Sequence, residues 1–181
     1  MTRLEATRIV VDAAGDAPII ASLGHPAYDL FAAGDRPQNF YTWGSMGLAS
    51  SIGLGLALAR PDRRVYVIDG DGSLLMNLGS LATIGFLRPG NLVVVVMDNE
   101  EYATTGGQQT PTAHGADLAA AAAAMAIAPV ARARTELELR AALIASRFVL
   151  VKVVTSAPGA KPSNDCVLLK QRLMTAIGNP E

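Results

Sequence analysis

The sequence is poor in cysteine and in charged residues, and each shortage excludes a class of protein. Its single cysteine, Cys166, cannot form an internal disulfide framework or a metal site built from several thiolates. Charged residues make up only 17% of the chain, and the formal net charge is −1 at pH 7. This balance provides no basic surface for a nucleic acid. We therefore expect no nucleic-acid partner, and we interpret Cys166 as an incidental thiol.

Hydrophobic runs long enough for a membrane are also missing. The longest strongly apolar run, residues 92–97, is far too short to cross a bilayer. Residues 1–16 contain Glu5, Asp12 and Asp16, and they lack the basic start and the apolar stretch of a secretory signal. The sequence thus predicts a cytoplasmic protein with no membrane partner.

Hydrophobic residues, in contrast, are abundant. They make up 50% of the 181 residues, and this length suits one domain. An apolar fraction this high indicates either a large core or a surface that another subunit covers.

Strand and helix patterns alternate along the chain. Continuous apolar strands between helices are typical of a parallel sheet covered on both faces. We therefore predict an α/β fold with a single doubly wound domain over residues 1–155, followed by a linker and a C-terminal helix within residues 156–181. The polar segment 100–115 is expected to be a loop. The predicted strands are residues 17–23, 64–68, 91–97 and 148–154, and the predicted helices are residues 26–33, 46–60, 74–87, 117–126, 135–145 and 167–177.

Two polar motifs directly follow two of these strands. Asp71 stands in the turn Gly70-Asp71-Gly72, and Asn99 follows the most apolar strand. In a parallel α/β sheet, ligands bind at the carboxyl ends of the strands, so both side chains can face the same crevice. Mg²⁺ prefers oxygen ligands and is often bound by a carboxylate together with phosphate oxygens. The glycines allow a close backbone approach, and the N–H groups of a helix starting near Ser73 would face an anion.

These motifs resemble those of a known cofactor family. Gly-Asp-Gly, twenty-six intervening residues and then Asn99 resembles the thiamine diphosphate motif. Upstream, TWGSMGLASSIGLGLALA at residues 42–59 resembles the segment that grips the pyrimidine ring of that cofactor. The similarity covers roughly residues 17–155 and is closest to the 2-oxoacid decarboxylases that act on sulfopyruvate or phosphonopyruvate. The short chain and the Thr-Thr-Gly-Gly-Gln segment at residues 104–108 look most like sulfopyruvate decarboxylase β subunits.

The resemblance implies a set of ligands for thiamine diphosphate and Mg²⁺. Asp71, the side chain of Asn99 and the backbone carbonyl of Glu101 would bind the metal. The carbonyl of Gly44 would accept a hydrogen bond from the pyrimidine amino group. Met46 would support the bent cofactor, although it could also be an ordinary core residue. The implied cofactor-binding residues are Ser22, Leu23, Gly24, Gly44, Ser45, Met46, Gly70, Gly72, Ser73 and Tyr102.

Several residues near these motifs allow two interpretations. His25 would contact substrate or diphosphate, or else cap the surface, and Tyr102 would pack within a lid or contact substrate. His114 is more typical of a solvated loop. Glu100 flanks the metal motif where many relatives have Asn or Gly, and a carboxylate there could alter lid or substrate contacts. Gly53-x-Gly55 lies inside a helical pattern, which favours close helix packing over a dinucleotide-binding loop.

The resemblance also implies what the chain lacks. Members of this family activate the cofactor with a glutamate that a separate pyrimidine-binding domain provides, so we expect no catalytic residue in this chain. It would be the β subunit of a heteromeric, sulfopyruvate-type 2-oxoacid decarboxylase, a lyase acting on a small anionic 2-oxoacid with an α chain as partner. The alternatives are a phosphonopyruvate decarboxylase-like or acetolactate synthase-like split enzyme, or a non-catalytic cofactor-binding module.

Overall fold

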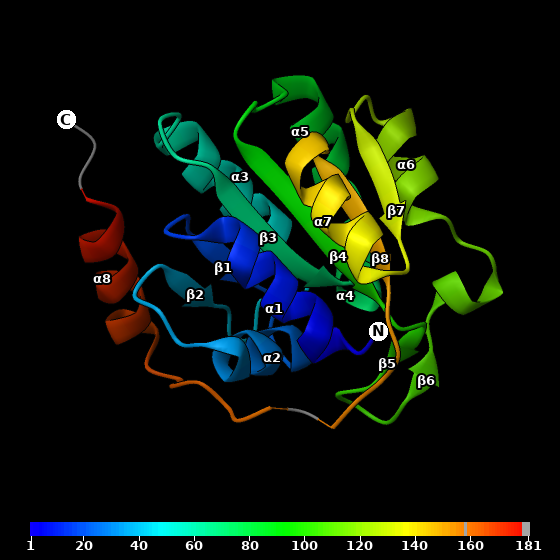
Figure 1. Cartoon of the computed structure of the whole chain (residues 1–181), viewed down its shortest axis with the longest axis horizontal. Coiled ribbons are helices and arrows are strands. Elements are labelled where there is room, and N and C mark those ends of the chain that lie inside the picture. The colour runs from blue at the N-terminus through cyan, green and yellow to red at the C-terminus, as the bar shows by residue number, and fades with distance from the viewer. Residues whose placement is uncertain (158, 179–181) are drawn as a thin grey trace.

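The chain folds into a parallel sheet with helices on both of its faces (Figure 1). This computed structural model describes residues 1–157 and 159–178. The predicted C-terminal segment 156–181 includes residues 158 and 179–181, which lie outside the described part. Within the described part, no helix is both long enough and apolar enough to cross a membrane.

The main sheet has six strands in the order β2-β1-β3-β4-β8-β7, and all neighbouring strands are parallel. From β1 the chain runs outward to β2 and then returns to β3 on the other side of β1. This change of direction opens a crevice at the carboxyl ends of β1 and β3. The strands are β1 (Ile19–Ala21), β2 (Asn39–Tyr41), β3 (Val65–Gly70), β4 (Leu92–Asp98), β7 (Val130–Ala133) and β8 (Phe148–Lys152).

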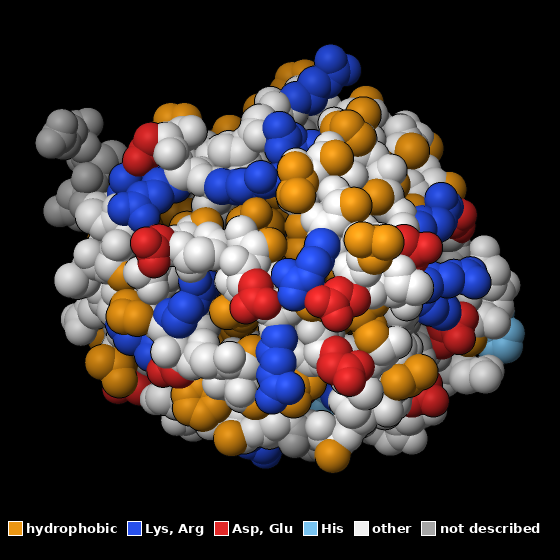
Figure 2. Space-filling model, in the orientation of Figure 1, with side chains coloured by type: hydrophobic (Ala, Val, Ile, Leu, Met, Phe, Trp, Pro, Cys, Tyr) orange, Lys and Arg blue, Asp and Glu red, His pale blue; other side chains and the backbone are white. Residues whose placement is uncertain are grey.

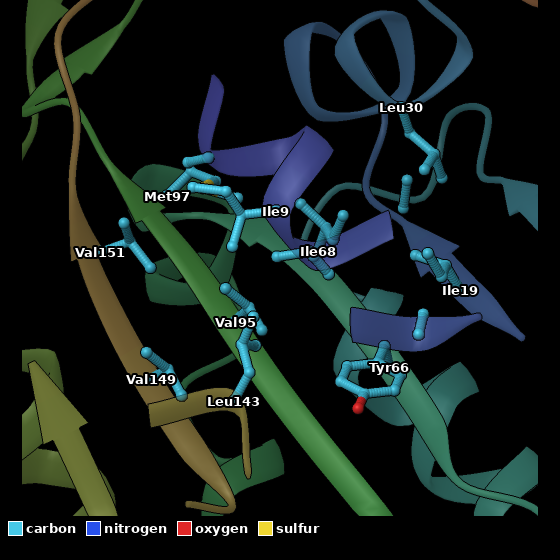
Figure 3. Packing of buried hydrophobic residues seen from close by; sticks show 14 of the residues in the cluster. Ile9, Ile19, Leu30, Tyr66, Ile68, Val95, Met97, Leu143, Val149 and Val151 are labelled. Carbon is cyan, nitrogen blue, oxygen red and sulfur yellow. The ribbon is translucent and has the colours of Figure 1, made fainter. Parts of the chain in front are cut away.

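Each face of the sheet has its own core, because successive residues of a strand point to opposite faces. Ile68 and Val95 pack with helices α1, α2 and α7 (Figure 3), whereas Val67 and Val94 pack with α3, α4, α5 and α6. The predicted α/β fold with two covered faces is confirmed. These helices are α1 (Arg3–Ala14), α2 (His25–Ala33), α3 (Ala49–Ala59), α4 (Asp71–Met76), α5 (Ser80–Leu87), α6 (Leu118–Ala124) and α7 (Glu136–Ala145).

The structure corrects two predicted helices and adds three elements outside the segment 100–115. The helix expected over residues 74–87 is two helices, α4 and α5, because Asn77 leaves helical geometry and its side chain donates to the carbonyl oxygen of Gly47 at 3.1 Å. The helix expected from residue 46 begins later, after a left-handed turn at Gly47 with a φ of 85°. Helix α1 lies in a stretch without strong apolar periodicity, and the edge strands β2 and β7 are short, so none of these three was predicted.

The segment predicted as a loop, residues 100–115, contains short elements of its own. Strands β5 (Glu101–Tyr102) and β6 (Gln108–Gln109) form an antiparallel hairpin, and the 3₁₀ helix η1 (Pro111–His114) follows. This hairpin lies directly after β4, at the edge where the predicted site residues gather.

The C-terminal helix, α8 (Cys166–Ile177), packs against the edge of the sheet next to β2. Leu169 and Leu173 are buried in the cores of opposite faces, and Arg172 forms an ion pair with Asp35 at 2.7 Å. The boundary predicted at residue 155 stays a prediction, but the described part of this helix is docked on the sheet. Cys166, at its first turn, is exposed.

The face over α1 and α7 mixes basic and acidic side chains with scattered hydrophobic ones (Figure 2). On it, Arg140 pairs with Glu136 at 2.8 Å and with Asp12 at 3.4 Å. Exposed pairs of this kind contribute little to stability.

Two glycines of α3 provide a test of how tightly this helix packs on the sheet. A Cβ at Gly53 would lie 2.2 Å from Cγ2 of Val67, whereas a Cβ at Gly55 would meet open space. We expect Gly53→Ala to lower the free energy of unfolding by about 1–3 kcal/mol through overpacking. Gly55→Ala should raise it by about 0.5–1 kcal/mol, because alanine favours the helix. Urea unfolding would measure both, and equal effects of the two changes would contradict this packing.

Candidate functional site

The two strand ends that carry the predicted metal ligands are neighbours in the sheet. Strands β3 and β4 pair so that Gly70 lies opposite Met97. Asp71 is therefore one residue, and Asn99 two residues, beyond the last pair at the same edge. Both line one pocket. The structure thus brings together the two side chains on which the sequence prediction depends.

Three oxygen atoms converge at this edge. The side-chain oxygen of Asn99 lies 3.1 Å from Oδ1 of Asp71 and 3.2 Å from the carbonyl oxygen of Glu101. All three atoms are hydrogen-bond acceptors, so they repel one another unless a cation lies among them. Adjacent oxygen ligands of an octahedral Mg²⁺, each about 2.1 Å from the ion, are about 3 Å apart. The cluster therefore has the spacing of such ligands.

A hydrogen-bond relay holds the amide of Asn99 in this orientation. Its nitrogen donates to Oγ1 of Thr155 at 3.2 Å, and that hydroxyl donates to the Glu101 carboxylate at 3.0 Å. A rotated amide would instead donate to Asp71 and to the Glu101 carbonyl, and it would take the hydroxyl proton away from the carboxylate. The rotated amide satisfies all of these atoms in a site without a cation, whereas the orientation with three converging oxygens requires a cation among them.

Two threonines fix the other oxygen of Asp71, which is almost fully buried. Oγ1 of Thr110 donates to Oδ2 at 2.5 Å, and Oγ1 of Thr112 lies 2.9 Å from the same atom. Thr112 also lies 2.9 Å from Asp98, so its single proton serves two carboxylates. Burial raises the pKa of Asp71, and the two threonine hydroxyls oppose that rise. The threonines therefore leave Oδ1 for the oxygen cluster.

Glu100 is turned toward a lysine. It forms an ion pair with Lys152, which also binds Asp98 at 3.1 Å, and it is not among the residues that line the pocket. Its φ of 63° is uncommon for a residue with a side chain. This left-handed residue stands between Asn99 and Glu101 and turns the chain where their oxygen atoms converge. The carboxylate flagged in the sequence thus shapes the backbone here.

A buried hydroxyl joins three segments beneath the pocket. Ser22, at the end of β1, and Ser73, in the first turn of α4, share a hydrogen bond of 2.9 Å. The N–H of Gly47 donates to the same Ser73 hydroxyl at 2.9 Å. Ser73 therefore ties the ends of β1 and β3 to the turn that carries Met46.

Asp69 is a buried carboxyl that the sequence motif did not single out. Its Oδ1 accepts a hydrogen bond from the N–H of Gly70 at 2.9 Å, whereas Oδ2 makes no hydrogen bond of good geometry. Burial raises the pKa of Asp69 to about 6, although the nearby hydroxyls of Ser73 and Ser22 lower it in part. Below that pH, the carboxyl adds little negative charge beneath Asp71.

The β5–β6 hairpin covers the pocket at two glycines. A Cβ at Gly72 would lie 2.3 Å from the ring of Tyr102, and a Cβ at Gly24 would lie 2.7 Å from Oγ1 of Thr104. Gly24 also has a φ of 75°, which L side chains rarely adopt. Tyr102 thus packs on the glycine of the metal motif as part of the pocket wall.

Some predicted cofactor residues are outside the pocket lining. Ser22 and Gly24 instead contact lining residues, as described above. Gly44 and Ser45 lie in the turn just before Met46, with Gly44 exposed. The predicted residues that line the pocket are Leu23, Met46, Gly70, Asp71, Gly72, Ser73, Asn99, Glu101 and Tyr102.

The two histidines whose roles the sequence left undecided differ in position. His25 lines the pocket at the start of α2, and burial lowers its pKa, as does the positive charge of Arg3. His114 is exposed at the end of η1 and is not a lining residue. Sequence reasoning missed six lining residues: three lie in the hairpin turn, one begins α1, and two lie in α2 and β4 beside residues that were singled out. These are Arg3, Pro26, Met97, Ala103, Thr104 and Thr105.

Comparison with known families agrees with this geometry. Residues 22–153 match the family described as "Thiamine pyrophosphate enzyme, C-terminal TPP binding domain". The chain belongs to this family. Thiamine pyrophosphate is another name for thiamine diphosphate, so the family resemblance drawn from the Gly-Asp-Gly and Asn99 motifs is confirmed.

Individual relatives are similar over much of the chain. The β subunit of sulfopyruvate decarboxylase from Methanocaldococcus jannaschii is 42% identical over 97% of this chain and 96% of that protein. The β subunit from Methanothermobacter thermautotrophicus is 50% identical over 69% of this chain and 66% of that protein. Phosphonopyruvate decarboxylase from Streptomyces viridochromogenes is 48% identical over 68% of this chain, which spans 31% of that protein.

Among solved structures, a thiamin diphosphate-dependent enzyme from Mycobacterium smegmatis shares the fold. Its TM-score is 0.70 at 24% sequence identity, and the match covers 90% of this chain and 32% of that one. The shared fold agrees with the parallel sheet and its two covered faces.

The shared hydroxyl of Ser73 generates a prediction with a matched control elsewhere in the fold. Ser73→Ala leaves the buried N–H of Gly47 without an acceptor, so we expect a loss of about 1–3 kcal/mol in the free energy of unfolding. Ser80 forms a similar buried pair with Ser50 at 2.8 Å, and no main-chain donor shares that pair. Ser80→Ala should therefore cost about 1 kcal/mol or less. Urea unfolding without cofactor would compare them, and equal losses would contradict the role given to Ser73.

Proposed function

We propose that this chain is the β-type subunit of a thiamine diphosphate-dependent 2-oxoacid decarboxylase, and that it holds the cofactor diphosphate through Mg²⁺. The similarity along nearly the whole length of a sulfopyruvate decarboxylase β subunit supports the type of enzyme and the role as a subunit. The proposed substrate is a small anionic 2-oxoacid of the sulfopyruvate type.

The convergence of three oxygen atoms carries the proposal for the metal. Asp71 supplies one negative charge, and Asn99 and the Glu101 carbonyl supply neutral oxygens within 3.2 Å of each other. Three protein ligands leave about half of an octahedral shell for phosphate oxygens and water. A cation with such an incomplete protein shell is suited to bind together with a diphosphate.

Other pocket residues suit the remaining parts of the cofactor. Gly72 lines the pocket, and because it has no side chain it leaves room for the ring of Tyr102 in the pocket wall. Met46 is 37% exposed and lines the pocket, which supports a contact with the cofactor and argues against an ordinary core position. When bound, thiamine diphosphate supplies the carbanion chemistry that decarboxylation requires. The residues of this chain would hold and orient it.

A phosphonopyruvate decarboxylase is the second candidate, favoured by the 48% identity to the Streptomyces enzyme. The length of the match separates the two candidates. This chain spans 31% of that enzyme but 96% of the Methanocaldococcus β subunit. Similarity along the whole of a subunit favours the sulfopyruvate type.

We further propose that a partner subunit with a pyrimidine-binding domain completes the active site and supplies the activating glutamate. Among the described residues that line the pocket, Glu101 is the only glutamate, and its carboxylate accepts a hydrogen bond from Thr155. Beside the pocket, Met46, Leu48 and Met76 are 37%, 45% and 64% exposed. Exposed apolar side chains at the rim of a site are suited to an interface with another chain.

Thr110 provides a test of the metal site without removal of a ligand. Thr110→Val keeps the shape of the side chain but removes the proton donated to Asp71, so we expect Mg²⁺ affinity to fall roughly 10- to 100-fold. Thr110→Ser keeps the hydroxyl and should bind Mg²⁺ nearly as well as the original chain. Isothermal titration calorimetry with Mg²⁺, in the presence of thiamine diphosphate, would measure the Mg²⁺ affinity of both variants. An unchanged Mg²⁺ affinity in Thr110→Val would count against the assignment of Asp71.

The subunit proposal predicts activity only in a mixture of chains. The purified chain, with Mg²⁺ and excess thiamine diphosphate, should release no CO₂ from sulfopyruvate above the cofactor-only background. Among the described residues that line the pocket, the only glutamate is Glu101, and Thr155 engages its carboxylate. Addition of the partner subunit should restore turnover, and replacement of the partner's activating glutamate by glutamine should remove it. Phosphonopyruvate and pyruvate would serve as comparison substrates. Decarboxylation by the isolated chain would refute the division between two subunits.

A further inference from the structure

Helix α1 contributes to the pocket a side chain that belongs to none of the cofactor motifs. Arg3 lines the same pocket as Asp71 and Asn99, and its side chain is only 3% exposed. Nε donates to Oδ2 of Asp29 at 2.9 Å, and Nη2 donates to the carbonyl oxygen of Ser156 at 3.0 Å. Nη1 is buried and has no hydrogen-bond partner among the described residues.

The hydrogen bonding of this buried guanidinium is incomplete. Its N–H groups are all donors, and a buried donor without an acceptor loses its hydration without compensation. Asp29 is also buried, which raises its pKa, while the positive charge of Arg3 opposes that rise. The carboxylate therefore fixes one edge of the guanidinium, and the two N–H groups of Nη1 are left for an acceptor within the pocket.

The position of Arg3 favours the diphosphate end of the pocket. Arg3 begins α1, which covers one face of the sheet, whereas Met46 precedes α3, which covers the opposite face. Asp71 lies between them, at the end of a central strand. A cofactor whose reactive end rests near Met46 and whose diphosphate is bound at Asp71 directs its terminal phosphate toward α1. His25, in the first turn of α2, lines the pocket on that side as well.

We infer that Nη1 of Arg3 binds the terminal phosphate of thiamine diphosphate, with Asp29 as the residue that positions it. The inference rests on the proposed function and adds a phosphate-binding residue from a helix outside the known motifs. Nη1 suits this task, because its two diverging N–H groups can donate charge-assisted hydrogen bonds to a phosphate oxygen and to a second acceptor in the pocket. Since Arg3 and Asp29 together are neutral, the contribution comes from directed hydrogen bonds to the terminal phosphate.

The test compares thiamine diphosphate with thiamine monophosphate, which lacks the terminal phosphate. Calorimetry in the presence of Mg²⁺ would measure both affinities for the full chain. Arg3→Met alone would leave Asp29 buried and unpaired, so the main variant is Arg3→Met/Asp29→Leu, which removes the pair. Arg8→Met, at an exposed arginine of the same helix, is the matched control. Circular dichroism and thermal unfolding would verify that each variant folds.

We expect the double variant to bind thiamine diphosphate roughly 10- to 100-fold more weakly, the effect of losing hydrogen bonds to a charged group. Its affinity for thiamine monophosphate should stay within about twofold, and Arg8→Met should change neither value. If the double variant does not fold, Arg3→Lys replaces it. The lysine ammonium can pair with Asp29 but has no second nitrogen for the phosphate, so the preference for diphosphate over monophosphate should again fall.

Three results would overturn the inference alone. The first is an unchanged affinity for thiamine diphosphate in a folded variant, and the second is an equal loss of affinity for the diphosphate and the monophosphate. In the two-subunit mixture, a raised KM for the 2-oxoacid with unchanged cofactor affinity would assign Arg3 to the substrate and also overturn it. If the original chain binds no thiamine diphosphate with Mg²⁺, the proposed function fails, and the inference fails with it.

Discussion

Repulsion among three acceptor oxygens at the ends of β3 and β4 is the constraint around which the site is built. The side-chain oxygen of Asn99 lies 3.1 Å from Oδ1 of Asp71 and 3.2 Å from the carbonyl oxygen of Glu101, without a proton between them. The surrounding structure maintains this convergence at several points. Thr110 holds the far oxygen of Asp71, Thr155 holds the amide nitrogen of Asn99, and a left-handed residue at position 100 turns the backbone between two of the ligands. Because these restraints come from separate segments of the chain, the proposed metal site keeps its shape without a bound cation.

The same restraints connect the metal site to the walls of the pocket. Thr110 directly follows the β5–β6 hairpin, whose Tyr102 packs on Gly72, so the residue that fixes the proposed metal ligand Asp71 also anchors the hairpin. On the other side, the hydroxyl of Ser73 accepts a hydrogen bond from Gly47 and so ties the metal motif to the turn that presents Met46. Displacement of one wall therefore disturbs the metal site, which explains why small residues recur where the segments cross.

The sequence predicted those site residues whose positions follow from the strand that directly precedes them. Asp71 and Asn99 each follow a long apolar strand, and adjacent parallel strands necessarily deliver such residues to one edge. The missed parts depend on distant packing. Arg3 reaches the pocket only because α1 packs beside α2, and the break between α4 and α5 comes from the contact of Asn77 with Gly47, thirty positions away in the chain. Strands β2 and β7 lie at the edges and are too short for a clear periodic pattern.

The distribution of charge in the pocket gives a physical reason for two subunits. Asp71 faces the proposed metal, Arg3 faces the proposed terminal phosphate, and the Glu101 carboxylate is engaged by Thr155. On these assignments, the charged groups that this chain places in the pocket serve the diphosphate end of the cofactor. The rim near the reactive end instead presents Met46 and other exposed apolar side chains. The proposed decarboxylase would still need charged groups to bind an anionic substrate and to activate the ring, and the proposed partner would supply them at this rim. Substrate choice would then depend mainly on the partner, while this subunit determines how firmly and in which orientation the cofactor is held.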